Sequence, residues 1–228
     1  MSLRNPSILE SVAQDEMDNP SPRKHLYHRD IYLSRNYWAL SPNELGRSVI
    51  TDFGLAVRGD EAPNSHPIQP DEYRAPEVCL GCEWSYSVDI WNLGVMLWDL
   101  FYGHSAFDMP QDLDRPVSAD KAYLGQIISL LGPPPPELLS QGKKASNYFD
   151  AQGMLSGSWL ICSIGQFKFP ELIKRKDLLS IVREIDDDNG IPEFVDFCSQ
   201  ILRWKPEDRS TAEDLLSHPW LPQMKAFR

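Results

Sequence analysis

The sequence has no long apolar run, few cysteines and no excess of basic residues. A membrane-spanning helix needs about 20 consecutive apolar residues, and no stretch reaches that length, so we expect neither a span nor membrane binding. Residues 1–6 carry no charged leader followed by an apolar stretch, and we expect no secretory signal. The formal net charge of −11 has the wrong sign for a protein that binds nucleic-acid phosphates. It favours basic partners instead.

Cysteine is scarce and irregularly spaced: the chain has Cys79, Cys82, Cys162 and Cys198. Cys79 and Cys82 have the C-x-x-C spacing of a zinc or redox pair. A zinc site needs a second pair of ligands, and no matching Cys/His pair stands elsewhere in the sequence. We therefore interpret the cysteines as structural thiols, with a metal site as the alternative. Their small number favours a reducing compartment, the cytoplasm or the nucleus.

The apolar residues that are present predict a mainly helical fold. They make up 42% of 228 residues, enough for one domain or one large domain with an arm. The helix over 88–102 has almost no polar face, so we expect it to be buried on all sides. Short strands are expected at Ile31–Leu33 and Ile50–Ala56. The other expected helices cover 7–19 (with Ser7 as its cap), 118–131, 192–204 and 211–216.

Two short motifs stand in order along the chain. Asp52-Phe53-Gly54 is followed, 25 positions after Asp52, by the Glu77 of Ala75-Pro76-Glu77. This interval suits the activation segment between the D-F-G and A-P-E motifs of protein kinases. With Asp89-Ile90-Trp91-Asn92-Leu93-Gly94 downstream, the chain resembles the C-terminal lobe of a eukaryotic-type protein kinase.

Further residues narrow the resemblance. Arg74 directly before Ala75-Pro76-Glu77, and the run Leu130–Pro135, resemble the CMGC group of kinases, which has an insertion there. Ile68-Gln69 and Phe149–Gly153 resemble the SR-protein kinases, and residues 7–24 resemble a segment of their fungal relatives that follows the catalytic loop. The implied organisation has three parts: an N-terminal helix with an irregular insert-like segment (1–48), a kinase C-terminal lobe (49–222) and a tail (223–228). Within the lobe we expect the activation segment at 52–77, the core helix at 88–102, the insertion at about 133–190 and the C-terminal helices at 192–217.

The resemblance assigns a role to several residues. Asp52, with Phe53 and Gly54, would hold Mg²⁺ and ATP, and the parent activity would be transfer of the γ-phosphoryl group to Ser or Thr. The substrates would be basic proteins, Arg/Ser-rich ones among them. Structural roles fall to Arg74, to Glu77 paired with Arg209, and to Asp89, which would hold the catalytic-loop backbone or cap its own helix. The substrate-docking candidates are Asp120 on the helix 118–131 and Asp108, Asp112 and Asp114 in the loop before it, where a solvated acidic loop is the alternative.

The chain also departs from the kinase pattern. His28-Arg29-Asp30 spells the catalytic-loop motif, but Arg35 stands where the loop has Asn. We interpret Asp30 as a chance match, with a working catalytic base as the alternative. No glycine-rich phosphate loop or Val-Ala-Ile-Lys strand is present, and Lys24 is the only lysine before Asp52. The 51 residues before Asp52 are too few for the usual ATP lobe, so we expect that lobe to be absent.

These departures leave three interpretations open. The chain is a piece of an active kinase, a non-catalytic docking module, or a minimal kinase that uses Asp30 and Asp52. We favour the first and expect no tight ATP binding by this chain alone. Without the opposite lobe, apolar surface around Phe53 would be exposed, and we expect self-association through that interface.

Overall fold

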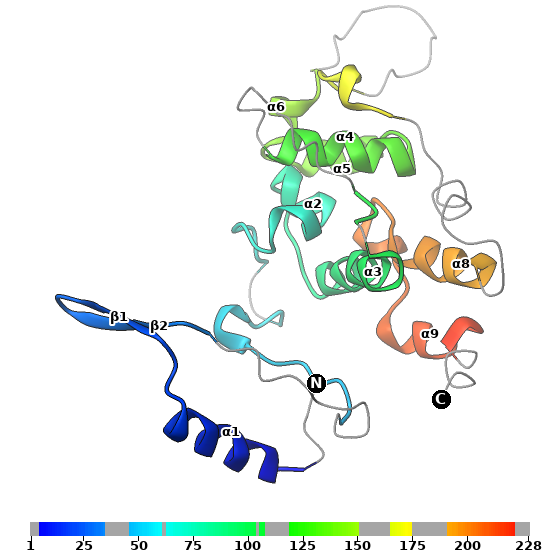
Figure 1. The fold of residues 1–228 in the computed structure, drawn as a ribbon. Helices are drawn as coiled ribbons and strands as arrows, with labels where there is room; N and C mark the ends of the chain where they lie inside the picture. Colours follow the sequence, from blue (N-terminus) through cyan, green and yellow to red (C-terminus); the bar gives the residue numbers. More distant parts are fainter. Residues whose placement is uncertain are drawn as a thin grey trace, which may run out of the picture. The chain divides into compact units, whose positions relative to one another are not determined.

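The computed structural model describes residues 5–34, 46–60, 63–103, 105–107, 119–150, 165–174 and 191–221. They belong to two compact units, Met1–Val57 and Arg58–Arg228. Within the described residues the chain is mainly helical, as the sequence predicted (Figure 1). Its single sheet has two strands; the second overlaps the strand expected at Ile31–Leu33, and the first was not predicted. None of the helices in these ranges is long and apolar enough to cross a bilayer.

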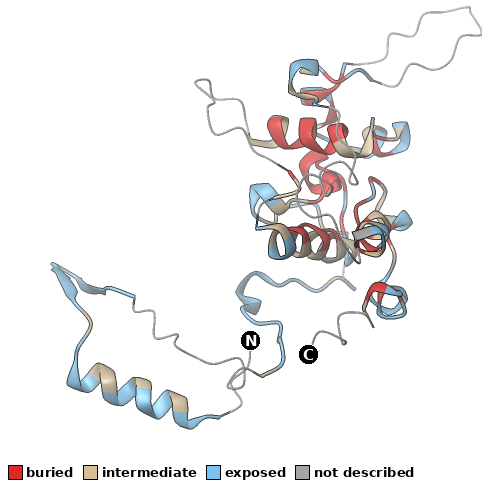
Figure 2. Ribbon diagram, turned by 45° about the vertical axis from the view of Figure 1, so that its right-hand side comes forward, coloured by how far each residue is buried: buried red, intermediate tan, exposed pale blue. Residues whose placement is uncertain are grey.

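The first unit holds one helix and one hairpin. The helix α1 (Ser7–Asp18) has no buried residue, and the strands β1 (Arg23–Leu26) and β2 (Arg29–Tyr32) pair antiparallel. These elements carry the colours of exposed and half-buried residues in Figure 2. Such a unit has little apolar burial to stabilise it.

Two expectations for this unit were wrong. Ser7 is the first residue of α1, and Pro6, whose side chain has no hydrogen-bond acceptor, holds the cap position. The segment Ile50–Ala56 is not a strand: its second half is the short 3₁₀ helix η2 (Phe53–Leu55). The reason is that no strand among the described residues pairs with it, and a strand needs a hydrogen-bonding neighbour.

The second unit contains the remaining elements in the described ranges. The long helices α3 (Ser87–Tyr102), α4 (Ala119–Leu131) and α8 (Ile191–Ile201) confirm three of the expected helices. The fourth is present as α9 (Ala212–Leu216). The shorter pieces are η3 (Asp71–Tyr73), α2 (Pro76–Leu80), α5 (Pro136–Gln141), α6 (Ala145–Tyr148), η4 (Pro170–Leu172) and η5 (Pro206–Asp208).

Helix α3 contributes the largest buried side chains of the core. Trp91 stacks on Phe107 with ring centroids 5.8 Å apart, and Trp98 packs against Phe194 of α8. Gly94 lets α3 and α8 approach closely, because a Cβ atom there would lie 2.5 Å from Cγ2 of Ile201. The core around them is completed by Val95, Tyr123, Leu124, Ile127, Phe197 and Leu202.

The expectation that this helix is buried on all sides was wrong. Met96 is 41% exposed and Leu100 is 71% exposed. Apolar composition shows what a helix is able to bury, whereas burial also needs a neighbour on each face. Among the described residues, Met96 and Leu100 therefore lack such a neighbour over part of their surface.

Candidate functional site: the segment anchored at Glu77 and Arg209

The segment from Ile68 to Glu77 is held to the helical base by a buried ion pair. Arg209 donates from Nη1 to Oε1 of Glu77 at 2.7 Å and from Nη2 to Oε2 at 2.6 Å. Both side chains have no exposed surface. The two parallel bonds make a bidentate guanidinium–carboxylate pair, the most directional ion pair available to proteins. The structure thus brings together the two residues that the sequence paired.

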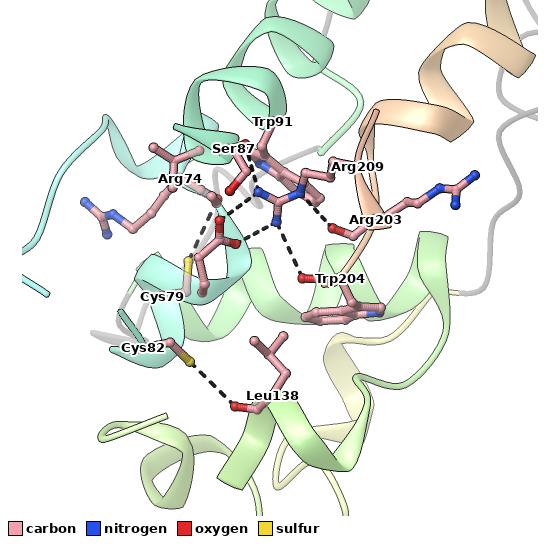
Figure 3. Close-up of polar contacts among 12 residues, drawn as sticks. Arg74, Cys79, Cys82, Ser87, Trp91, Leu138, Arg203, Trp204 and Arg209 are labelled. Atoms are coloured by element: carbon pink, nitrogen blue, oxygen red, sulfur yellow. Dashed lines mark hydrogen bonds and ion pairs between the residues drawn. The ribbon is translucent and has the colours of Figure 1, made fainter. Parts of the chain in front are cut away.

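The surroundings of Arg209 satisfy the rest of its guanidinium. Its Nε donates to the carbonyl of Arg203 at 3.1 Å, its Nη1 to that of Ser87 at 3.0 Å and its Nη2 to that of Trp204 at 3.4 Å (Figure 3). With the two bonds to Glu77, all five donors of the side chain are used. The guanidinium also lies over the Trp91 ring, 5.1 Å from its centroid, where a cation–π contact is favourable. Arg209 therefore ties α2, the start of α3 and the α8–α9 connection to one point.

Gln69 makes a second set of contacts that hold the segment in place, and the sequence analysis did not predict it as a site residue. Its backbone has φ of 66°, the left-handed region that non-glycine residues seldom occupy. Its side chain bridges two backbone groups: Oε1 accepts from the Ala75 amide at 2.8 Å, and Nε2 donates to the Val88 carbonyl at 2.9 Å. A residue in this backbone region whose side-chain amide makes a hydrogen bond at both its nitrogen and its oxygen marks an over-determined position, which is typical of functional segments.

Arg74 joins the same segment to α4. It donates from Nη1 to Oδ1 of Asp120 at 2.7 Å and lies 2.6 Å from Oδ1 of Asp71. Tyr148 of α6 donates to the other oxygen of Asp120 at 3.1 Å. Asp120 was predicted as a substrate-docking acid, and the structure places its carboxylate in this internal network. The other docking candidates, Asp108, Asp112 and Asp114, lie outside the described residues.

Tyr73 packs the segment against α3. Its hydroxyl donates to Oδ2 of Asp99, and Asn92 donates to its carbonyl at 3.3 Å. The hydrogen bond to Asp99, with burial, raises the pKa of Tyr73 to about 12. The tyrosine is therefore neutral at physiological pH and serves as a donor.

Asp89 lies in the first turn of α3 and has no hydrogen-bond or ion-pair partner among the residues that the structure describes. The cap position belongs to Tyr86, and no side-chain cap bond is present, so Asp89 does not cap its helix. Its carboxylate has no hydrogen bond or ion pair with any described residue, and the residue is exposed. Desolvation by the neighbouring protein nevertheless raises the pKa of its carboxyl group. An acidic side chain in this state is available to a donor from elsewhere.

Asp52, Phe53 and Gly54 lie in the first unit. Asp52 has φ of 61° and ψ of 57°, again in the left-handed region, and Phe53 is 67% exposed. No group of three or more His, Cys, Asp or Glu side chains in the described part of the chain is arranged to hold a metal. Since Mg²⁺ takes one or two carboxylates together with substrate phosphates, Asp52 would supply one ligand of such a site. The described residues do not by themselves make a complete Mg²⁺–ATP site.

The His28-Arg29-Asp30 motif falls in the hairpin of the first unit. Asp30 lies on β2 directly opposite His25, and its Oδ1 is 2.6 Å from Nδ1 of that histidine. Arg23 lies 3.7 Å from the other carboxylate oxygen. Asp30 is therefore engaged in cross-strand contacts of a hairpin, and nothing in this arrangement resembles a loop that presents a base to a substrate.

The cysteines that the structure describes lie inside the protein. Cys79, Cys82 and Cys198 are buried and carry free thiols. Burial raises the pKa of Cys82 to about 11 and that of Cys198 to about 12, so both are protonated and unreactive. Cys162 lies outside the described residues.

Comparison with known proteins identifies the family to which the motifs point. The protein kinase domain family matches residues 23–221. The chain belongs to the protein kinase family. It is 35% identical over 219 residues to a serine/threonine protein kinase of Aspergillus fumigatus, covering 94% of this chain and 51% of that protein. This chain thus spans about half the length of that curated relative.

Two other relatives place the kinase among CMGC-like enzymes. The serine/threonine-protein kinase SKY1 of Saccharomyces cerevisiae is 34% identical over 181 residues, which are 79% of this chain and 23% of SKY1. The dual specificity tyrosine-phosphorylation-regulated kinase mbk-2 of Caenorhabditis elegans is 31% identical over 191 residues, 77% of this chain and 22% of mbk-2. The resemblance to CMGC and SR-protein kinases read from the motifs is confirmed.

Proposed function

We propose that this chain is the substrate-docking C-terminal lobe of an SR-protein-kinase-like serine/threonine kinase. Alone, it binds basic, Arg/Ser-rich segments and does not transfer phosphate. The observation that carries the proposal is the anchored segment 68–77, which Gln69, Arg74 and Glu77 fasten to three different helices or turns. Phosphoryl transfer depends on positioning the acceptor hydroxyl, and positioning needs a rigid support.

Three features support the lack of catalysis by this chain alone. Asp30 is tied to His25 and Arg23 in an exposed hairpin. Asp52 offers a single carboxylate to Mg²⁺, without further metal ligands grouped around it in the described residues. Asp89 resembles the kinase aspartate that binds the catalytic-loop backbone, and its carboxylate makes no hydrogen bond to any described residue. ATP and Mg²⁺ would supply the phosphoryl group and its charge neutralisation in the parent kinase.

The chemistry of the substrate follows from charge. The chain carries 33 acidic and 22 basic side chains, so a cationic peptide is attracted and an acidic one repelled. The SKY1 relationship supports an Arg/Ser-rich substrate. The buried free thiols support a reducing compartment, which we propose to be the cytoplasm or nucleus.

A pair of measurements on the purified chain tests this proposal. A labelled Arg/Ser-repeat peptide should bind saturably at low salt and weaken as salt is added, while a Glu/Ser-repeat control should not bind. With Mg²⁺ and ATP present, the wild-type chain should transfer no more phosphate to the Arg/Ser peptide than the Asp52→Ala variant does. Absence of peptide binding removes the docking role. Phosphate transfer that both Asp30→Ala and Asp52→Ala abolish would instead establish the minimal kinase.

A non-catalytic docking module is the second candidate, favoured by Asp89, which has no partner in the described part of the chain. It predicts the same peptide binding, so the two candidates are separated at the level of the gene. An in-frame His-x-Asp-x-x-x-x-Asn loop encoded just upstream of Met1 supports the kinase lobe. A stop codon or unrelated coding sequence at that place supports the module.

Asp120→Asn tests whether the network acid also docks substrate. Because Asp120 accepts from both Arg74 and Tyr148, its neutral replacement should lower thermal stability. A loss of peptide affinity beyond that seen for an equally destabilised core variant, such as Ile128→Val, assigns the carboxylate a docking role as well. An unchanged affinity restricts Asp120 to structure.

A further inference from the structure

Ser21 lies at the junction between helix α1 and the hairpin of the first unit. Two of its groups bind one carboxylate in the last turn of α1: its amide donates to Oε1 of Glu16 at 2.6 Å, and its hydroxyl donates to Oε2 at 2.8 Å. On the other side, the carbonyl of Pro22 accepts from the amide of Leu33 at 2.9 Å, where the hairpin ends. Ser21 therefore connects the end of α1 to the hairpin.

The residues after Ser21 are suited to recognition by a protein kinase. The sequence has two Ser-Pro pairs, Ser21-Pro22 and Ser41-Pro42. A proline keeps the residue before it extended and has no N–H that would need a partner. Bases follow only the first pair, as Arg23-Lys24, whereas Asn43-Glu44 follows the second. Charge patterns of this kind distinguish the substrates of one kinase from those of another.

Little free energy holds Ser21 in place. The residue is half-buried, and residues 22–24 are exposed. Neither α1 nor the two strands bury a residue, so no apolar packing has to break when the segment leaves the surface of this unit. The two hydrogen bonds to Glu16 exchange for hydrogen bonds to water at small cost. The hydroxyl is therefore accessible to an enzyme that binds the segment as an extended chain.

We propose that Ser21 is a phosphorylation site for a proline-directed serine kinase that recognises the bases after it. In this reaction Oγ of Ser21 bonds to the γ-phosphorus of ATP, the bond from that phosphorus to ADP breaks, and the hydroxyl proton passes to the catalytic base of the modifying kinase. The proposal does not rest on substrate docking by this chain, because Ser21 and the anchored segment 68–77 belong to different units.

Phosphorylation reverses the interaction between Ser21 and α1. The hydroxyl donor is replaced by a phosphate with a charge of about −1.5 to −2 at neutral pH, which faces the carboxylate of Glu16 and the negative end of the helix dipole. Arg23 and Lys24 attract the phosphate towards β1 instead. Every charged side chain of α1 is acidic: Glu10, Asp15, Glu16 and Asp18. The modification should therefore separate Ser21 from Glu16 and release the end of α1 from the hairpin.

Treatment of the purified chain with a cyclin-dependent kinase, Mg²⁺ and ATP tests the site. Tandem mass spectrometry should show phosphate on Ser21, formed about tenfold or more faster than on Ser41, because the bases raise the rate of association with an acidic kinase surface. Substitution of both Arg23 and Lys24 by glutamate keeps the Ser21-Pro22 pair and should reduce its rate to that of Ser41. A peptide of residues 15–29 is the reference without the fold, and it should be modified as well.

Nuclear Overhauser contacts in the phosphorylated chain test the consequence. Those between Ser21 and the Glu16 side chain should be lost, while those between Ser11 and Ile8, which are joined by a hydrogen bond within α1, should remain. Glu16→Gln separates charge repulsion from size. Its side chain has the same length and its amide donates to phosphate, so its contacts with residue 21 should persist after phosphorylation.

Three results would overturn the proposal. The first is a chain or a peptide in which the kinase leaves Ser21 unmodified. The second is an equal rate at Ser21 and Ser41, which would show that the bases are not recognised. The third is survival of the contacts between Ser21 and Glu16 in the phosphorylated wild type. The Arg/Ser-peptide binding assay uses the unmodified chain, so its failure and the failure of this proposal are distinguishable.

Discussion

Arg209 and Glu77 lie 132 residues apart in the sequence and form a two-bond ion pair from which water is excluded. Glu77 sits in α2, at the end of the anchored segment, and Arg209 follows η5. A buried pair of this kind contributes little over an apolar replacement, but the loss of one partner leaves a bare charge inside the protein. The pair therefore fixes the position of α2 relative to the chain that follows η5.

Removal of the guanidinium should destabilise the protein strongly. We expect Arg209→Ala to lower the free energy of unfolding by about 3–5 kcal/mol, because Glu77 is left buried and unpaired. Arg58→Ala is the matched control: Arg58 lies 2.7 Å from Asp60, but both side chains are more than half exposed, and stability should not change measurably. Urea denaturation followed by tryptophan fluorescence measures both. Equal effects of the two substitutions would contradict this role of the Arg209–Glu77 pair.

Gly94→Ala should also destabilise the protein, although Gly→Ala usually stabilises a helix. In an exposed helix, Gly→Ala stabilises by about 1 kcal/mol. Here the added Cβ would meet Cγ2 of Ile201 at 2.5 Å, and such overpacking costs about 1–3 kcal/mol. The penalty should shrink in an Ile201→Ala background, where the obstructing atom is gone. A double-mutant cycle of thermal unfolding tests this, and a penalty independent of residue 201 would show that the strain lies elsewhere.

The parts of the site that the sequence predicted are those that belong to short sequence motifs. Glu77 and Arg209 each sit in a recognisable run of residues, so their pairing followed from the family resemblance alone. The helices of the core followed from apolar periodicity. Both kinds of information are local and can be recognised from the sequence alone.

The parts that sequence missed depend on which groups the fold brings together. The role of Gln69 needs a left-handed backbone at that residue and the amide of Ala75 and carbonyl of Val88 on either side. Asp120 reads as a free acid on a helix until Arg74, 46 residues earlier, is placed against it. The open face of α3 was mistaken for core because composition does not report whether a neighbour is present.

Gln69 should be replaceable by neither a charged nor a small residue. Gln69→Glu keeps the acceptor for Ala75 but places a carboxylate against the Val88 carbonyl, and Gln69→Ala loses both bonds. We expect each to cost about 1–3 kcal/mol through unsatisfied backbone groups. Gln14→Glu, on the exposed helix α1, is the control and should change stability by less than about 0.5 kcal/mol. Thermal unfolding measures stability, and Arg/Ser-peptide affinity shows whether the segment keeps its shape.

Asp89 and Asp214 should respond to pH in opposite directions. Desolvation raises the pKa of Asp89 above its ordinary value, so the folded protein holds that proton more tightly than the unfolded chain. The stabilisation is full below the ordinary aspartate pKa and is lost as pH rises through the raised value. Asp89→Asn should therefore raise the melting temperature at pH 7 and have little effect on it at pH 3.

Asp214 provides the control of opposite sign. Its carboxylate accepts from the Thr211 amide and hydroxyl at 3.0 and 2.7 Å, and these hydrogen bonds lower its pKa. That stabilisation is present above the ordinary aspartate pKa and is lost as pH falls through the lowered value. Asp214→Asn should thus lower the melting temperature at pH 7 and converge with the wild type in acid. If Asp89→Asn also lowers it at pH 7, then a favourable partner of Asp89 outweighs the effect of desolvation in solution.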